Sequence, residues 1–143
     1  MSQVLVVRLP IRTRYAETDM MQYIHHSVYP VYFEAARTEL LRSIGVSYRA
    51  LEEQGILLPV MELGVKFFHP AYYDDELEIE ARYQPRRRAL IRLDYVVWRE
   101  QQRLAEGFTT HLFVDKQARR AMKPPQFFWD AVQKALEGQH ATV

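Results

Sequence analysis

One long run of helical periodicity, accompanied by segments that alternate with period two, most constrains the fold of this chain. Apolar side chains recur at helical spacing over residues 29–44. Ser27 is the predicted N-cap, Pro30 is tolerated in the first turn, and Gly45 is a typical helix stop. The sequence therefore predicts one long helix, whose apolar face is formed by Tyr29, Tyr32, Phe33, Ala36, Leu40 and Ile44.

Five segments with extended or alternating patterns accompany this helix. They span residues 4–15, 61–67, 77–83, 91–97 and 104–114. Pro10 indicates an edge position or a bulge in the first segment. Short connections join the last four strands, which makes them antiparallel, and the helix must bury its apolar face on their sheet. We therefore expect an α+β fold with one long helix against a five-stranded antiparallel sheet.

Two smaller helices complete the expected secondary structure. A short helix is predicted over residues 48–54, closed by Gly55. A last helix is expected after residues 124–125, with Phe128, Val132 and Leu136 on one side.

Composition narrows the class of protein. The chain has 143 residues and 48% hydrophobic residues, which suits a single globular domain over residues 1–143. Its apolar runs are too short to span a bilayer, and no export signal is visible, so we expect no membrane insertion. The absence of cysteine excludes a disulfide framework and a thiol nucleophile, and it fits a cytoplasmic location. A formal net charge of +1 gives no reason to expect a nucleic acid partner.

The segment that leads into the long helix carries the candidate chemistry. It places a carboxylate at Asp19 and an imidazole at His26, just ahead of the predicted helix start. A carboxylate on such a loop brings a base close to the positive end of the helix dipole. An aspartate ahead of a helix is commonly only a cap or turn residue, but Ser27 is the better cap here.

Residues 15–37 resemble the signature of the hotdog-fold acyl-CoA thioesterases, in the branch that includes 4-hydroxybenzoyl-CoA thioesterase and the YbgC-like enzymes. The resemblance is carried by Thr18-Asp19, His25-His26, Tyr29, Phe33-Glu34 and Arg37-Thr38-Glu39. It implies a hotdog fold, in which the sheet wraps around the long helix. It also implies hydrolysis of an acyl-CoA thioester to a free acid and coenzyme A, with no metal and no cofactor beyond the coenzyme A of the substrate.

The same resemblance implies a role for each site residue. Asp19 matches the catalytic aspartate, which either activates water or attacks the thioester carbonyl. His26 matches a position whose backbone N–H supplies the oxyanion hole, and Tyr15 matches an aromatic residue that accompanies the aspartate. Tyr29 is expected to contact the substrate. Many relatives carry glycine at the position of Gln22, so this residue is expected to reshape the loop or narrow the acyl entrance.

Two further groups of charged residues invite a functional and a structural interpretation. Arg86, Arg87 and Arg88 form the only dense basic run, which suits the phosphates of coenzyme A or else is a solvated turn. Glu34 is a second carboxylate, but an i,i+3 ion pair with Arg37 explains it more simply.

Alternative functions are narrowed by what the sequence lacks. It has no Gly-x-Ser-x-Gly elbow and no phosphate-cradling glycine loop, and its histidines have no metal-binding spacing. Hotdog hydratases or dehydratases and non-catalytic acyl-CoA-binding proteins remain alternatives, although Asp19 argues against the latter. Because a single sheet leaves edge strands, and because the resemblance implies sheets joined edge to edge, we expect a homodimer or homotetramer. We expect aliphatic acyl groups, since the histidine-containing motif is closer to the YbgC-like branch.

Overall fold

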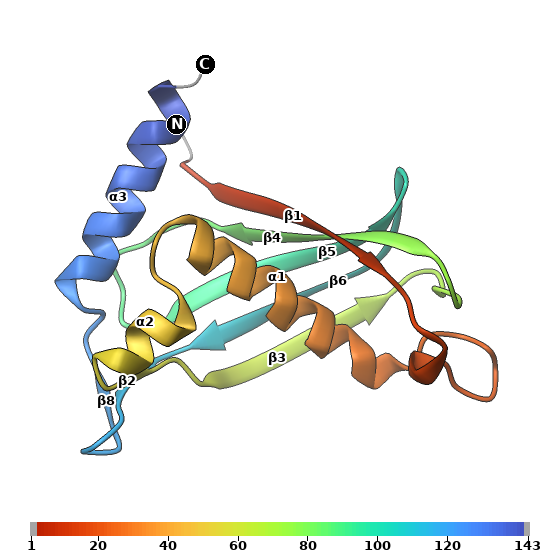
Figure 1. Cartoon of the computed structure of the whole chain (residues 1–143), viewed down its shortest axis with the longest axis horizontal. Helices are drawn as coiled ribbons and strands as arrows, with labels where there is room; N and C mark the ends of the chain where they lie inside the picture. Colours follow the sequence, from red (N-terminus) through yellow and green to blue (C-terminus); the bar gives the residue numbers. More distant parts are fainter. Residues whose placement is uncertain (1–2, 142–143) are drawn as a thin grey trace.

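The computed structural model describes residues 3–141, and its main feature is a five-stranded antiparallel sheet in the order β1-β4-β5-β6-β3 (Figure 1). These strands are β1 (Leu5–Arg12), β3 (Val60–Phe67), β4 (Glu76–Tyr83), β5 (Ile91–Arg99) and β6 (Gln102–His111). The helices are α1 (Tyr29–Ser43), α2 (Tyr48–Glu53) and α3 (Gln126–Ala141), with 3₁₀ turns η1 (Tyr15–Glu17) and η2 (His26–Val28). None of the described helices is long and apolar enough to cross a membrane.

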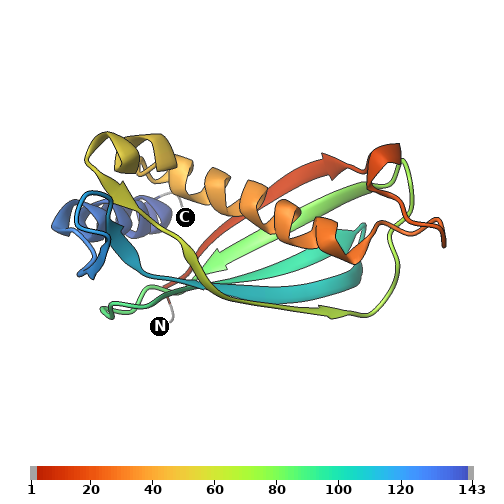
Figure 2. The same cartoon turned by 90° about the horizontal axis from the view of Figure 1, so that it is seen from below.

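The sheet curves around α1, which lies along its inner face (Figure 2). The predicted apolar stripe is confirmed, because Phe33 and Ala36 have no exposed surface and Leu40 is 1% exposed. Phe33 stacks on Tyr95 of β5 with 4.4 Å between ring centroids. A Cβ at Gly107 of β6 would lie 2.6 Å from the Phe33 ring, so glycine makes room for this stacked pair. Tight packing of one helix on the sheet thus confirms the predicted α+β architecture.

Proline and glycine act largely as their positions predict. Pro10 lies in β1, an edge strand of the sheet, which confirms the edge assignment. Gly45 adopts a φ of +84° after α1, and the Val46 N–H returns to the Leu41 carbonyl at 2.9 Å. This is a Schellman-type stop, as expected for a glycine there.

The predicted start of α1 is wrong in one detail. Val28 is the N-cap and makes no side-chain cap hydrogen bond, whereas Ser27 lies inside η2, which runs directly into the helix. Pro30 does lie in the first turn of α1. The 3₁₀ turn is itself capped by His25, whose side chain accepts a hydrogen bond from the Ser27 N–H. The helix therefore starts from a histidine-capped turn and not from a serine cap.

The predicted strand over residues 104–114 is in fact two strands. β6 ends at His111, and β7 (Phe113–Asp115) joins β2 (Ile56–Leu57) and β8 (Arg120–Met122) in a separate three-stranded sheet. Phe113 is fully buried and packs edge-on against Phe128 of α3, 5.0 Å away. Because the apolar pattern continues through this corner, periodicity alone did not reveal the break.

The predicted ion pair between Glu34 and Arg37 is wrong, because Arg37 turns into the core and is only 4% exposed. Its guanidinium donates to the Tyr48 hydroxyl at 2.6 Å and to the Tyr95 hydroxyl at 3.1 Å. Tyr95 in turn bonds to Thr109 at 2.6 Å. The buried charge therefore ties α1 to α2 and to the sheet, while Glu34 is exposed on the helix surface.

Candidate active site

The candidate site lies where two loops meet at one end of the sheet, the loop between β1 and α1 and the loop between β3 and β4 (Figures 1 and 2). The Ile24 N–H donates to the Ala71 carbonyl at 2.8 Å, and Tyr23 and Tyr72 form an antiparallel bridge. The rings of these two tyrosines also pack edge-on, with 5.7 Å between centroids. The two loops thus hold each other in place.

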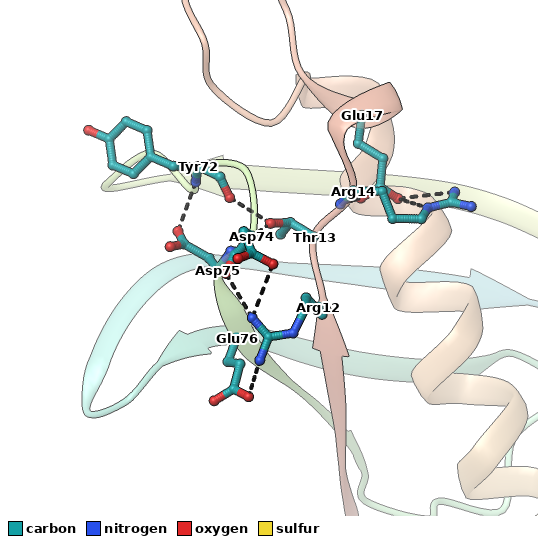
Figure 3. A network of polar contacts seen from close by, with 8 residues as sticks. All are labelled: Arg12, Thr13, Arg14, Glu17, Tyr72, Asp74, Asp75 and Glu76. Carbon is teal, nitrogen blue, oxygen red and sulfur yellow. Dashed lines mark hydrogen bonds and ion pairs between the residues drawn. The ribbon is translucent and has the colours of Figure 1, made fainter.

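A polar network fixes the second loop to the end of β1 (Figure 3). The Thr13 hydroxyl donates to the Tyr72 carbonyl at 2.6 Å and accepts from the Asp75 N–H at 2.9 Å. Asp75 accepts from the Tyr72 N–H at 2.8 Å and from Arg99 at 2.8 Å. Arg12 pairs with Asp74 and Glu76 at the same junction, as Figure 3 shows. The base of the site is therefore held by side chains from three strands and the loop.

Asp19 organises the turn in which it lies. Its Oδ1 accepts from the Met21 N–H at 2.9 Å and from the Tyr23 N–H at 3.1 Å. Its own N–H donates to the Tyr23 carbonyl at 2.8 Å. No hydrogen bond within the described chain uses the second carboxylate oxygen. Asp19 is thus a turn residue, and it also has one oxygen left for other chemistry.

Gln22 occupies the conformation that favours glycine. Its φ is +67°, in the left-handed region, where a side chain raises the energy of the backbone. Its N–H donates to the Asp19 carbonyl at 2.9 Å, which closes the turn. The loop therefore keeps a glycine-like path although the chain has glutamine there.

The start of the helix leaves a donor available beside Asp19. His25 Nδ1 accepts from the Ser27 N–H at 3.1 Å and lies 2.8 Å from the Ser27 hydroxyl. No hydrogen bond within residues 3–141 uses the His26 N–H. The two imidazole rings lie 4.1 Å apart. An N–H without a partner at the positive end of a helix is a suitable donor to an anion.

A pocket of about 290 Å³ brings several of these groups together. Asp19, His26 and Tyr29 line it, so three predicted site residues share one cavity. The rest of its wall comes from the same loop and from the end of β3, and consists of Met21, Tyr23, Ile24, Phe67, Phe68, His69 and Pro70. A larger surface hollow of about 700 Å³ lies along β1 and β4, but its wall includes the ion-paired Arg12 and Arg99. The smaller pocket is the better candidate site.

Tyr29 forms part of the floor of this pocket. It is only 2% exposed and packs edge-on against Phe67, with 4.9 Å between centroids. Burial raises the pKa of the Tyr29 phenol, although its hydrogen bond to the Ala71 backbone acts in the opposite direction. The phenol is therefore neutral and serves as part of an aromatic wall.

Tyr15 and Gln22 are not among the residues that line the pocket. Tyr15 lies in η1, is 76% exposed, and packs edge-on against Tyr73 at 5.6 Å. Tyr15 therefore belongs to a 3₁₀ turn and not to a strand, and its role beside Asp19 stays a prediction. In this chain Tyr15 and Tyr73 join the outer sides of the two loops.

Glu17 is a buried carboxylate that sequence reasoning missed. It is 8% exposed, and its Oε1 accepts from the Tyr32 hydroxyl and the Arg14 N–H, both at 2.8 Å. Burial, and then this hydrogen bond, raise the pKa of Tyr32. The i,i+3 spacing of Arg14 and Glu17 was the available signal, because Glu17 closes a capping arrangement around η1. Its role is to anchor the loop to α1.

The three predicted arginines lie on the β4–β5 loop, at the opposite end of the sheet from the pocket (Figure 1). Arg86 and Arg88 line a second pocket of about 360 Å³ together with Arg92. Arg87 instead lies over the Trp129 ring of α3, with 5.4 Å to the ring centroid. The structure therefore separates the run into two residues that share a pocket and one that packs on a helix.

Residues 3–141 contain no group of three or more acidic, histidine or cysteine side chains arranged to hold a metal ion.

Known proteins similar to this chain identify its family. A model described as Thioesterase-like superfamily matches residues 13–136. The acyl-CoA thioester hydrolase YbgC of Escherichia coli O157:H7 is 37% identical over 73 residues, which are 51% of this chain and 54% of that protein. The crystal structure of the hypothetical protein TT1821 from Thermus thermophilus is 40% identical and superposes with a TM-score of 0.83, covering 88% of this chain and 96% of that one. The DHNA-CoA thioesterase of Staphylococcus aureus, 24% identical, shares the fold with a TM-score of 0.84 over 96% of this chain and 94% of its own.

The chain therefore belongs to the Thioesterase-like superfamily. The predicted hotdog fold is confirmed, and so are the predicted family and the enzyme class, a thioester hydrolase. The roles of Asp19, His26 and the other site residues stay predictions.

Proposed function

We propose that this protein is an acyl-CoA thioesterase, which hydrolyses an acyl-CoA thioester to a free carboxylic acid and coenzyme A. The observation that carries the proposal is the pocket in which Asp19 lies beside the start of α1, where the His26 N–H has no partner in the described chain. Thioester hydrolysis needs a base or nucleophile and a donor to the oxyanion, and these two groups are suited to those needs.

Asp19 is the proposed base or nucleophile. Two backbone N–H groups hold its Oδ1, so the carboxylate is oriented without a side-chain partner. The free oxygen then takes a proton from water or attacks the carbonyl carbon directly. Both routes need the negative charge of the carboxylate, and they differ only in whether an anhydride forms.

His26 supplies the proposed oxyanion donor through its backbone. As the thioester carbonyl is attacked, negative charge develops on its oxygen. A fixed N–H at a helix start stabilises that charge by a hydrogen bond and by the helix dipole. Because the donor belongs to the backbone, substitution of the His26 side chain is expected to leave it in place. The aromatic wall made by Tyr29 and Phe67 suits the apolar acyl group. An aliphatic preference stays a prediction, and a panel of acyl-CoAs of varied length and aromaticity tests it.

Coenzyme A binding is proposed to involve Arg86 and Arg88, which share a pocket with Arg92. Arginine is well suited to phosphate because its planar fork donates two parallel hydrogen bonds. β4 has eight residues and separates this loop from the Asp19 end, which corresponds to about 25 Å at about 3.3 Å per residue. We therefore propose that the arginine pocket of one subunit binds the nucleotide of a coenzyme A whose thioester lies in the Asp19 pocket of another subunit.

A homodimer would satisfy this geometry. β3 is an edge strand, and its exposed apolar side chains include Met61, Leu63 and Phe67, at 53%, 46% and 49% exposure. An edge with such side chains favours pairing with a second copy. Antiparallel pairing of two β3 strands about a two-fold axis would bring the β4–β5 loop of one subunit to the Asp19 end of the other. Light scattering tests this proposal, and a 17.0 kDa particle at micromolar concentration would reject it. A tetramer of two such dimers and a cytoplasmic location stay predictions.

The decisive test of the activity is Asp19→Asn. Asparagine keeps an Oδ1 that can accept from the Met21 and Tyr23 N–H groups, so the turn should survive while the base is lost. We expect thiol release from acyl-CoA to fall by about 10²–10⁴-fold, the usual contribution of a positioned base. Asp19→Ala removes the turn acceptor as well and serves as the comparison for loop damage.

Two results would point to the alternative functions. Tight binding of acyl-CoA by the wild-type protein without thiol release would favour a non-catalytic acyl-CoA-binding protein. Addition of water to an enoyl-CoA without thiol release would favour a hydratase. An Asp19→Asn variant that releases thiol at the wild-type rate would exclude the proposed mechanism.

A further inference from the structure

A second histidine, His69, lines the candidate pocket from the loop between β3 and β4. It lies two positions after the end of β3 and is among the residues that line the cavity with Asp19 and His26. Its side chain is exposed, and no hydrogen bond of the imidazole to any residue in the described part of the chain is present. The wall of the pocket therefore includes one aspartate and two histidines, and the histidines come from different loops.

The backbone around His69 is held firmly although its side chain is free. The His69 N–H donates to the Leu104 carbonyl at 3.1 Å, and the Phe68 N–H shares that acceptor at 2.8 Å. On the other side, Arg99 donates to the Pro70 carbonyl at 3.2 Å. Catalytic side chains are typically carried on backbone that is fixed by its surroundings.

The other histidine side chains near the pocket have other surroundings. His25 Nδ1 lies within hydrogen-bonding distance of both the N–H and the hydroxyl of Ser27, so this ring caps η2. His26 lies in the first turn at the helix start, with its ring 4.1 Å from that of His25. The proposed role of His26 uses its backbone N–H. In the described chain, His69 is thus the imidazole of this pocket region that makes neither a side-chain hydrogen bond nor a ring contact. The reaction still needs a proton for the leaving sulfur.

We propose that His69 is a catalytic acid, which donates its imidazolium proton to the coenzyme A sulfur as the carbon–sulfur bond breaks. This inference rests on the proposed thioesterase function. Water adds its oxygen to the carbonyl carbon and gives a proton to Asp19. The tetrahedral intermediate then collapses, and the electron pair of the carbon–sulfur bond leaves with the sulfur. His69 supplies the proton that converts this thiolate to the thiol. The proton on Asp19 passes to solvent, and neutral His69 regains one from solvent, so the balance is one water consumed for one acid and one thiol formed.

Changing the leaving group distinguishes an acid from a residue that only supports the structure. An aryl thiol leaves as a stable thiolate and needs little help from an acid, whereas the alkyl thiol of coenzyme A gains more from it. The same acyl group should therefore be offered to the protein as its coenzyme A ester and as its thiophenyl ester. The variants to compare are His69→Gln, which cannot donate the proton as an imidazolium does, and Asp19→Asn, which lacks the base.

We expect His69→Gln to lower kcat for the coenzyme A ester by about 10–100-fold, at the low end for acid catalysis because thiolates leave readily. Its rate with the thiophenyl ester should change less than about threefold, while Asp19→Asn should lose activity on both esters because both reactions need a base. His69→Asn provides a second variant, and thermal unfolding verifies that each variant is folded.

Four results separate the possible failures. Equal losses on both esters would mean that His69 supports binding or shape, and an unchanged rate on both would mean that it is a surface residue, so either result overturns the assignment. If His26→Gln instead shows the selective loss on the coenzyme A ester, the acid is His26. A wild-type protein that releases thiol from neither ester would contradict the thioesterase proposal itself.

Discussion

The buried histidine His111 makes the stability of this protein depend on pH between about 4 and 6.5. It has no exposed surface, and its Nε2 lies 2.8 Å from the Thr109 hydroxyl. Its Nδ1 lies 3.4 Å from the Leu58 carbonyl. The Arg37 guanidinium donates to Tyr95, whose hydroxyl bonds to Thr109, so a cation lies at the far end of the same network. Burial first, and then the Arg37 charge, lower the pKa of His111 from 6.5 to about 4.

With a neutral His111 ring, each hydrogen bond of this network has one donor and one acceptor. Tyr95 accepts from Arg37 and donates to Thr109, Thr109 donates to His111 Nε2, and His111 Nδ1–H points to Leu58. A proton on Nε2 would force Thr109 to accept there and to donate to Tyr95 instead, and it would add a second buried positive charge. Folding therefore favours the neutral ring.

The sign and size of the effect follow from linkage. Because the pKa is lower in the folded state, the unfolded chain binds more protons between pH 6.5 and about 4, so stability falls as the pH falls. The full contribution is present above about pH 6.5. At about 1.36 kcal/mol per pH unit, the loss from pH 7 to pH 5 is about 2 kcal/mol, and it approaches about 3 kcal/mol near pH 4.

The assay compares wild type with His111→Gln by denaturant unfolding at pH 7 and pH 5. The variant should be less stable at pH 7, by about 1–3 kcal/mol, because it disturbs buried hydrogen bonds. Its further loss at pH 5 should be smaller than that of wild type by about 2 kcal/mol, because it lacks the titrating ring. Other titrating groups are common to both proteins and cancel in this difference. Equal losses in the two proteins between pH 7 and pH 5 would refute the reasoning.

Three other predictions concern the loops and the core. Gln22→Gly should raise the free energy of unfolding by about 0.5–1 kcal/mol, because glycine tolerates the φ of +67°, and denaturant unfolding measures this. Replacing Arg86 and Arg88 together with Gln should raise KM for acyl-CoA about twofold to tenfold at low salt with kcat unchanged, because such exposed contacts bind ground and transition states alike. Arg87→Gln is the matched control for that kinetic assay, since Arg87 lies over a ring of α3. An equal rise in the KM of this variant would contradict the proposal that Arg86 and Arg88, and not Arg87, bind coenzyme A. Gly107→Ala should cost about 1–3 kcal/mol of unfolding free energy, because its Cβ would lie 2.4 Å from a backbone oxygen, and an unchanged midpoint of unfolding would contradict this.

Periodicity predicted the parts of the fold that depend on one buried face. The stripe from Tyr29 to Leu40 and the alternation in β4 and β5 each match the sides that are buried. The corner after His111 was missed because Phe113 is as apolar as its neighbours, and only the second sheet decides that it changes partners. The start of α1 was missed because a 3₁₀ turn runs into the helix, and in that turn a histidine ring performs the capping function usually given to serine or aspartate. Local patterns therefore predict the layers, while junctions depend on long-range contacts.

The site divides in a similar way. Asp19, His26 and Tyr29 were predicted from a short motif, and one cavity does join them. His69 lies 50 positions after Asp19 in the chain, so no local pattern connects the two residues. Their proximity comes from the pairing of Ile24 with Ala71 and of Tyr23 with Tyr72, which closes the two loops on each other. A motif thus identifies the group that begins a reaction more readily than the group that completes it, because the second can come from any strand that ends at the same edge.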